Sequence, residues 1–404
     1  MNKTIVLVTA FVLASPVFAY EIDVGGKAEI FGTTYFHDKQ AADSASLDLR
    51  LLPELKLRAD KFLVYMQGDL RVDTEEASNG LSEYDGKRSI IALREAFLRY
   101  SGDVFDVKIG KLIFDWSVTD TVSPSDNFGA RDWLDIIEWE RTGVPAIDLR
   151  IGSDAFAEFV YVPRLVPSIL PEPKTRWSAL PVGIGQVDVE APKDSEQFAI
   201  RFGTNWQRYD WSLSYYDGYN YSPAFRLENS NLAPEYQREQ VVAGAVAGEM
   251  LGFNARVELG YFTQDSNDDY LQYVVGADRE WSGVFCERDG FLALVQYSDE
   301  AFVVENQNPN SVESFDLKRI FNGAILYRLK YSPDGDMLSG KLIYGLEGIV
   351  NLEGGDKYTE VNVTYKGESY EVKMGVGVPT GQDGSFFGQY KENDRVYGKL
   401  TWRF

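Results

Sequence analysis

The last ten residues of the chain alternate between two kinds of side chain. Apolar or small residues occupy Val396, Gly398, Leu400, Trp402 and Phe404, and polar or charged residues lie between them. A period of two predicts a β-strand whose two faces meet different surroundings. A soluble domain rarely ends in this way, because free chain ends fray. The pattern therefore predicts an ordered strand that runs to the final residue.

The same alternation recurs along most of the chain. Clear segments begin at six positions: Ile22, Ala45, Phe62, Leu338, Val361 and Tyr370. Less regular segments lie in the middle of the chain: 198–202, 211–215, 241–247, 253–261, 291–297 and 325–329. The first three of the clear segments span about ten residues or more, which exceeds the 5–6 residues of an ordinary soluble strand. They match the roughly 9–11 residues of a strand that crosses a membrane at a tilt.

Short connections alternate with long polar ones. Tight turns are expected at four places: 60–61, 208–210, 332–336 and 366–368. Long polar connections lie elsewhere: 40–44, 73–88, 165–195, 220–237, 300–316 and 379–394. We count about sixteen to eighteen strands and predict an all-β fold, a transmembrane antiparallel β-barrel with long extracellular loops and an inward-folded loop. A soluble β-sandwich or propeller would also alternate, but it would explain neither the strand length nor the terminal Phe404.

Aromatic residues make up 14% of the chain, and many lie near the ends of the predicted strands. Aromatic side chains favour the two interfaces between a membrane and water. We expect the following residues to form two interfacial girdles: Tyr35, Phe36, Tyr100, Trp116, Tyr161, Tyr219, Tyr261, Trp281 and Trp402.

The N-terminus has the features of an export signal. A basic start at Lys3 precedes a mostly apolar run from Ile5 to Leu13, and small residues lead up to Ala19. The run is too short to span a bilayer, which needs about 20 apolar residues. We therefore expect residues 1–19 to be a cleaved signal peptide and residues 20–404 to form a single transmembrane barrel in the bacterial outer membrane.

Charge and rare residues exclude several classes of function. The formal net charge is −22, with 62 acidic against 40 basic residues, which disfavours binding to nucleic acid. An acidic lumen would favour cations. Cys286 is the only cysteine, and we expect a buried small hydrophobe there rather than a reactive thiol. His37 is the only histidine, so we expect neither an enzyme nor a zinc site, and no cofactor.

The last strand of the chain and one internal stretch resemble known outer-membrane barrels. The final strand resembles the closing strand that the barrel-assembly machinery reads through a terminal Phe, here Phe404. The internal stretch resembles a porin-like family of proteobacterial outer-membrane barrels with a Gly-Lys, Trp, Asp, Pro-x-Asp signature. The residues that carry this resemblance are Arg94 to Phe97, Gly110, Lys111, Trp116, Asp120, Pro124, Asp126, Asn127, Arg131, Asp132, Gly143 to Ala146, Val162 to Arg164, Pro167 and Pro171. The chain departs from the signature at Leu112, where the family has Gln, and around Trp116.

The stretch between about residues 114 and 141 breaks the alternation and holds most of the candidate site. It combines apolar and aromatic residues with many acidic residues. A loop of this kind is not expected to extend into solvent, where its apolar side chains would be exposed. We expect it to fold back into the barrel and to present charged side chains to the pore. The candidates are Asp115, Asp120, Asp126, Arg131, Asp132 and Asp135. Alternatively, these residues only cap turns, or a short helix near Trp133, and pair with their neighbours.

Three arginines on early strands complete the candidate set. Arg50, Arg58 and Arg71 fall on the predicted inner face, opposite the acidic loop. Such an arrangement would set a transverse field in a constriction, or it would only stiffen the wall through a ladder of ion pairs. The sequence thus predicts a porin-like channel for small hydrophilic solutes or ions, surrounded by outer-membrane lipid and lipopolysaccharide. A structural or export-partner barrel with a plugged lumen is the alternative.

Overall fold

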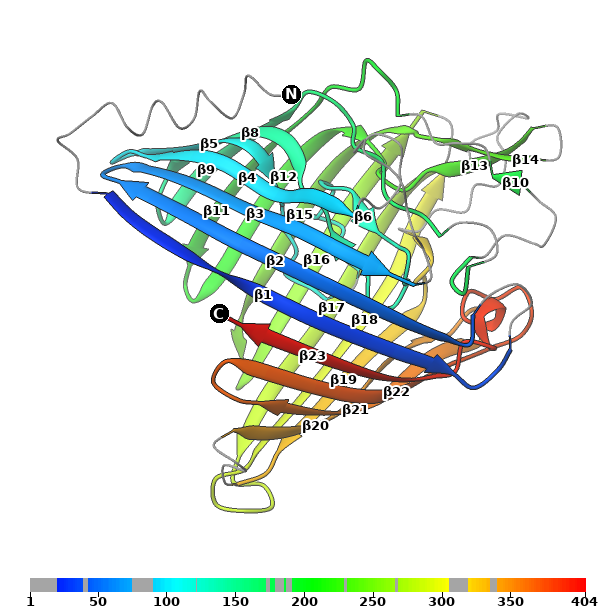
Figure 1. Cartoon of the computed structure of the whole chain (residues 1–404). Coiled ribbons are helices and arrows are strands. Elements are labelled where there is room, and N and C mark those ends of the chain that lie inside the picture. Colours follow the sequence, from blue (N-terminus) through cyan, green and yellow to red (C-terminus); the bar gives the residue numbers. More distant parts are fainter. Residues whose placement is uncertain are drawn as a thin grey trace.

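Eighteen antiparallel strands form one closed sheet in the computed structural model of this chain (Figure 1). The structure describes residues 20–38, 43–74, 90–120, 122–171, 175–178, 185–186, 191–228, 231–265, 268–304, 319–334 and 340–404. The expected signal peptide lies outside these residues. No helix in the described part of the chain has the length and the apolar character needed to cross a membrane. The predicted antiparallel barrel is confirmed, and its strand number lies at the upper end of the expected range.

The barrel strands follow one another around the wall in chain order. They are β1 (Tyr20–Tyr35), β2 (Ala45–Ala59), β3 (Phe62–Asp73), β4 (Ile91–Ser101), β5 (Phe105–Leu112), β8 (Val144–Gly152), β9 (Ala155–Val162), β11 (Gln197–Trp206), β12 (Tyr209–Tyr219), β15 (Arg238–Met250), β16 (Phe253–Gln264), β17 (Asp269–Ser282), β18 (Gly290–Val304), β19 (Ala324–Ser332), β20 (Lys341–Asn351), β21 (Asp356–Lys366), β22 (Tyr370–Thr380) and β23 (Arg395–Arg403). The connections contain β6 (Arg131–Asp132), β7 (Glu140–Arg141), β10 (Gly185–Gln186), β13 (Ala224–Glu228), β14 (Asn231–Glu235) and the short 3₁₀-helix η2 (Gly388–Tyr390).

The C-terminal strand closes the barrel against the first one. β23 pairs with β1 from Lys27 opposite Arg403 to Tyr35 opposite Arg395. The ladder continues to the last residue, because the Gly26 and Phe404 backbones exchange two hydrogen bonds of 3.0 and 3.2 Å. A Cβ at Gly26 would lie 2.9 Å from the Phe404 ring and 2.6 Å from a backbone oxygen, so this crossing requires glycine. The pattern of the last ten residues therefore predicted the closing strand correctly.

The connections differ sharply between the two ends of the barrel. At one end the strands are joined by tight turns, in which Asp60, Arg208 and Leu251 take positive φ angles of 51°, 74° and 56°. The start of β1 and the end of β23 lie at this same end, while the long connections lie at the other (Figure 1). This alternation of short and long connections is the habit of outer-membrane barrels, whose long loops face outwards.

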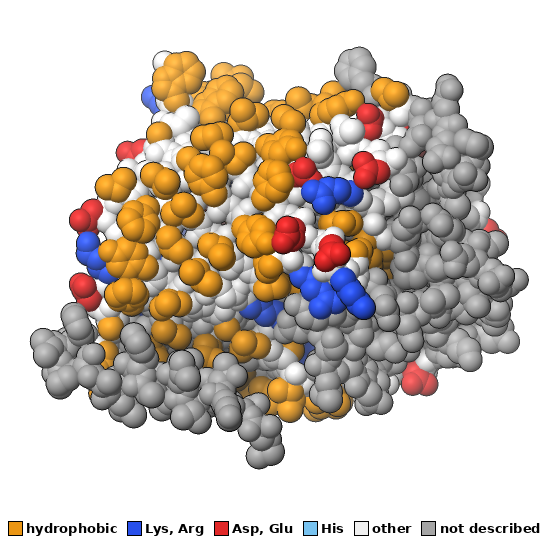
Figure 2. Space-filling view, turned by 90° about the horizontal axis from the view of Figure 1, so that it is seen from above, with side chains coloured by type: hydrophobic (Ala, Val, Ile, Leu, Met, Phe, Trp, Pro, Cys, Tyr) orange, Lys and Arg blue, Asp and Glu red, His pale blue; other side chains and the backbone are white. Residues whose placement is uncertain are grey.

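The outer face of the barrel is apolar and the inner face is polar. Outward positions on neighbouring strands carry exposed aliphatic side chains: Leu213, Val242, Leu259, Val275 and Val295. Figure 2 shows such side chains spread over one outer face, with charged groups at both sides of the apolar area. Buried polar residues, such as Glu258, Gln272 and Gln296, occupy inward positions of the same strands. Exposed apolar side chains on a closed barrel match a lipid environment, because every backbone group is already paired within the sheet.

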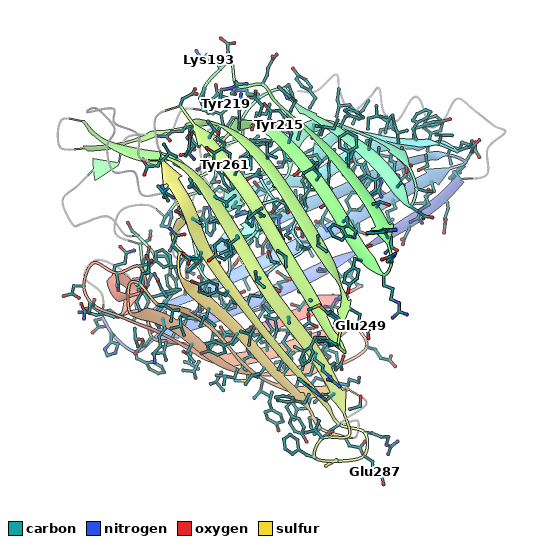
Figure 3. All side chains as sticks on the ribbon, turned by 180° about the vertical axis from the view of Figure 1, so that it is seen from behind. Lys193, Tyr215, Tyr219, Glu249, Tyr261 and Glu287 are labelled. Atoms are coloured by element: carbon teal, nitrogen blue, oxygen red, sulfur yellow. The ribbon has the colours of Figure 1, made fainter. Side chains whose placement is uncertain are left out.

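The expected aromatic girdle is correct in part. Tyr215, Tyr219 and Tyr261 lie near the long-loop end of the strands in Figure 3, whereas Glu249 and Glu287 lie near the short turns. Two of the predicted girdle residues are buried instead. Trp116 packs inside the barrel against Phe128, with ring centroids 5.1 Å apart, and Tyr35 packs against Trp177 and Tyr390. Strand-end position alone does not show whether an aromatic side chain faces lipid or the lumen.

Cys286 differs from the expectation for it. The residue is exposed in the turn between β17 and β18, and it is not a buried hydrophobe. Asp289 holds this turn by accepting hydrogen bonds from the backbone N–H groups of Val284, Phe285 and Cys286. The turn geometry therefore leaves the Cys286 side chain in solvent.

Candidate functional site

Residues 113–143, which connect β5 to β8 and are called the inner segment below, cross the interior of the barrel. The segment contacts β2 and β4 at one side and β16, β18 and β19 at another. Its aromatic residues explain the burial, since Phe128 lies against Phe114, Trp116 and the wall residue Tyr216 at centroid distances of 4.9–5.2 Å. An extramembrane loop would leave this apolar surface in water.

Glu258 on β16 anchors the first turn of the inner segment. Its Oε1 atom accepts hydrogen bonds from the backbone N–H groups of Val118 and Thr119, each at 2.7 Å. Its Oε2 atom accepts hydrogen bonds from the hydroxyl groups of Ser123 and Ser125 at 2.6 and 2.7 Å. The carboxylate is fully buried, so these donors replace the water that it would otherwise bind.

Asp120 links the segment to three further wall residues. Its carboxylate accepts hydrogen bonds from Arg256 on β16 at 3.2 Å and from Arg328 on β19 at 2.9 Å. Gln296 on β18 donates to the same carboxylate at 3.0 Å. These contacts fix the tip of the segment against the wall formed by β16 to β19.

Asp126 holds together the part of the segment that leads back towards β8. Its carboxylate accepts hydrogen bonds from Arg131 at 3.1 Å and Arg141 at 2.8 Å, and it also accepts one from the Trp116 backbone N–H at 3.2 Å. Both guanidinium groups lie over the Trp139 ring, at 4.8 and 5.5 Å from its centroid. Burial lowers the pKa of Arg131, and the facing Asp126 carboxylate opposes this shift.

The opposite edge of the segment faces the early strands and β23. Glu140 binds Arg50 on β2 at 2.7 Å and also pairs with Arg94 on β4. Burial raises the pKa of Glu140, but these two guanidinium groups outweigh it and hold that pKa well below the usual range. Asp135 pairs with the fully buried Arg395 on β23. The segment is therefore tied to the wall on both sides.

The structure places the nine sequence-predicted candidates as follows. Asp120, Asp126, Arg131, Asp132 and Asp135 lie in the segment with charged partners, and Arg50 and Arg71 contact it from the wall. Asp115 is more than half exposed and pairs with Arg141 at 2.9 Å. Arg58 lies apart, paired with Glu21 at 3.6 Å near the start of β1.

The short helix considered near Trp133 does not form. Asp132 instead accepts a hydrogen bond from the Leu134 N–H at 3.1 Å, and Asp135 accepts one from the Ile137 N–H at 2.8 Å. Residues 133–139 are a series of bends between β6 and β7. Both aspartates thus cap turns and also meet wall arginines, so the two interpretations of these acids apply together.

Sequence reasoning missed most of the wall partners. Glu258, Arg256, Arg328 and Arg395 were not among the candidates, although each makes a hydrogen bond or ion pair between the wall and the segment. Arg256 and Glu258 could have been predicted from the sequence to face the lumen, because they alternate with apolar Val257 and Leu259. This alternation places both charges on one face of a predicted strand.

Among the described residues, two charge-lined cavities lie beside the inner segment. The larger one, of about 210 Å³, lies between the segment and strands β17 to β22. The smaller one, of about 60 Å³, lies between the segment and strands β1 to β3 and β23. Four carboxylates and three cationic side chains line the first, and six carboxylates and three cationic side chains line the second. Glu138 lines both cavities.

Residues 175–178, called the mouth segment below, reach from the β9–β11 connection to the far side of the barrel. The Arg176 guanidinium donates hydrogen bonds to the backbone oxygens of His37 and Asp43 at 2.8 Å each. Trp177 packs on Tyr390 with ring centroids 5.5 Å apart and is almost fully buried. The mouth segment thus joins the β1–β2 and β22–β23 connections. The described residues contain no group of three or more His, Cys, Asp or Glu side chains arranged to hold a metal ion.

Comparison with known proteins identifies the fold. No family model and no curated protein sequence matches the chain. A BenF-like porin from Pseudomonas fluorescens matches at a TM-score of 0.52 and 9% identity, over 95% of this chain and 98% of that one. OccK11 (OpdR) of Pseudomonas aeruginosa and OccAB4 of Acinetobacter baumannii match at a TM-score of 0.50 each, with 10% and 12% identity. These matches cover 95% and 96% of this chain, and 96% and 99% of the other chains.

The apolar outer face and the closed sheet place the protein in the bacterial outer membrane. The chain has the fold of the outer-membrane porins.

Proposed function

We propose that this protein is an outer-membrane channel through which small hydrophilic solutes and ions diffuse, selected by a charged constriction at the inner segment. The observation that carries this proposal is the inner segment itself, which crosses an eighteen-stranded barrel and leaves a charge-lined cavity on each side. A barrel of this strand number encloses an aqueous lumen unless loops fill it.

The proposed constriction favours cations. Carboxylates outnumber cationic side chains around both cavities. In a narrow, low-dielectric passage such an excess attracts cations and repels anions over the range that salt does not screen. The proposed selecting residues are Asp120, Asp126, Asp132, Asp135, Arg50, Arg71 and Arg131, with Asp115 at the exposed edge.

Planar-bilayer recording of the refolded protein tests the proposal. Stepwise conductance is expected, together with a reversal potential of cation-selective sign under a KCl gradient. Absence of stepwise conductance from correctly folded protein would contradict the channel function. Arg58→Gln is a matched control, because Arg58 lies away from the inner segment, and its reversal potential is expected to equal that of the wild type.

One observation favours a second candidate, a barrel whose lumen is plugged and which serves a structural or export partner. The mouth segment is held against the β1–β2 and β22–β23 connections by the buried Arg176 and Trp177. A closed mouth would give folded protein without conductance. In that case, co-purification of a periplasmic partner with the wild-type barrel would favour the second function.

A further inference from the structure

We propose that the larger cavity is a binding site for small organic cations that carry an aromatic or branched apolar body on a short ammonium arm. This inference deepens the proposed channel function and rests on it, because the solute must enter the lumen to reach the cavity. The cavity lies between the inner segment and strands β17 to β22.

Aromatic side chains form much of the wall of this cavity. Eight aromatic side chains line it, including Trp133 and Trp139 of the inner segment and Tyr327, Tyr358 and Phe387 of the opposite wall. Aromatic faces carry partial negative charge and attract cations, with organic ammonium groups as the best-known ligands. Aliphatic residues such as Ile137 and Leu326 complete the lining and provide a surface for an apolar body.

Glu138 supplies the charge that such a ligand needs. No hydrogen bond or ion pair joins its carboxylate to any other described residue, although the side chain is half-buried and lines the cavity. The other carboxylates of the cavity are occupied. Asp126 binds Arg131 and Arg141, Glu347 binds Arg328 at 2.9 Å, and Glu360 binds Lys373 at 2.8 Å.

The cationic side chains around the cavity already form ion pairs with carboxylates, so the site does not favour an anion. Arg131, Arg328 and Lys373 each hold at least one carboxylate at 2.8–3.1 Å. Beyond the cavity, Arg395 pairs with Asp135, and Lys399 lies 3.8 Å from Glu29. An anion would have to displace one of these bound carboxylates, and the displaced acid would lose its partner. A cation that meets Glu138 displaces no hydrogen-bonded partner among the described residues, although Arg395, Lys373 and Lys399 interact electrostatically with this carboxylate.

The volume of the cavity limits the ligand. A cavity of about 150 Å³ holds a benzene molecule, so the 210 Å³ found here suits one ring and a short arm. 2-Phenylethylammonium has these dimensions and carries one positive charge. 3-Phenylpropionate has a similar shape and the opposite charge, which makes it the matched comparison.

The experiment measures binding of both probes to the refolded full-length barrel in detergent, through the fluorescence of the tryptophans in the cavity wall. Saturable binding of 2-phenylethylammonium is expected, with weaker binding of 3-phenylpropionate. Glu138→Gln is expected to weaken binding of the cation by about tenfold, because an ion pair in a partly buried, aromatic site is lost. Glu138→Asp keeps the charge and is expected to retain most of the affinity.

Glu287→Gln is the matched control, because Glu287 lies in the exposed turn between β17 and β18 at the far end of the barrel (Figure 3). Its affinity for both probes is expected to equal that of the wild type. Equal affinity of wild type and Glu138→Gln, or tighter binding of the anion, would overturn the proposal. Bilayer recording separates the two hypotheses. Conductance without cation binding would refute only this site, and binding without conductance would refute only the channel.

Discussion

Glu258 holds the inner segment to the wall through more hydrogen bonds than any of the candidates predicted from the sequence. One fully buried carboxylate accepts hydrogen bonds from four residues, Val118, Thr119, Ser123 and Ser125. All of them are donors, so the site demands an ionised acceptor. A neutral amide of the same size offers one acceptor oxygen and turns an N–H₂ group towards donors.

The variant Glu258→Gln should therefore loosen the inner segment. We expect a loss of about 3 kcal/mol in the free energy of unfolding, because several charge-assisted hydrogen bonds weaken and donors are left unpaired. Urea unfolding followed by tryptophan fluorescence measures this change. Glu249→Gln, at an exposed position beside a short turn, should leave the midpoint unchanged. A midpoint equal to wild type for both variants would contradict the anchoring role.

Glu138 gives the proposed cation site a dependence on pH. Burial raises the pKa of its carboxyl above the ordinary value of 4.5, although Arg395 opposes this shift. Only the ionised form attracts a cation, so the affinity for 2-phenylethylammonium should fall as the pH falls through this raised pKa. Titration of binding between pH 4 and 8 should show a midpoint above that of an ordinary glutamate. The same titration of Glu138→Gln should be flat, and an equal pH dependence in both proteins would contradict the assignment.

Among the elements, the mouth segment is the one that we propose restricts flow through the barrel. Trp177 fills a buried position against Tyr390 and lies beside Arg395, whose guanidinium is 5.3 Å from its ring. Trp177→Ala removes this packing and should release the segment. We expect a larger single-channel conductance, or more frequent large steps, in planar-bilayer recordings. Trp206→Ala changes an exposed tryptophan near a short turn and should leave conductance unchanged. Unaltered conductance in both variants would show that the mouth segment does not restrict flow.

The final strand also carries a proposal about assembly. Phe404 completes the ladder with β1, and its side chain is half exposed. We propose that the barrel-assembly machinery recognises this strand. Deletion of Phe404 should lower the amount of folded protein in the outer membrane several-fold, measured by heat-modifiable mobility on gels. Deletion of Tyr20, at the exposed start of β1, is the control. Equal assembly after either deletion would oppose recognition through Phe404.

For the whole molecule, the excess of acids around the lumen predicts how selectivity depends on salt. Cation preference should be strong at 0.01 M KCl and weak at 1 M, because the Debye length falls from about 30 to about 3 Å. Reversal potentials at several mean salt concentrations measure this trend. A preference that stays constant over the range would point to direct coordination of ions rather than to the summed field of the carboxylates.

Whether a feature of this protein could be predicted from the sequence depends on whether it arises from residues close together or far apart along the chain. The strands near Ile22, Ala45 and Phe62 were evident, because lipid on one side and water on the other impose a period of two on consecutive residues. The inner segment was recognisable because it breaks this period while keeping apolar side chains. The buried Trp116 and Tyr35 and the exposed Cys286 were misjudged, because the direction of a side chain at a strand end or in a turn depends on the neighbouring chain.

The sequence by itself determined that this protein is a membrane barrel closed by its last strand, since both features follow from local alternation and from a strand that continues to Phe404. Only the tertiary structure decided which charges meet. Asp120 finds Arg328, 208 residues away, and Asp135 finds Arg395, 260 residues away. These pairs depend on the register of all eighteen strands and on the path of the inner segment across the lumen. The same geometry leaves the Glu138 carboxylate without a hydrogen bond from any described residue, because the nearby cationic side chains pair with other acids, and no local pattern reveals those pairs.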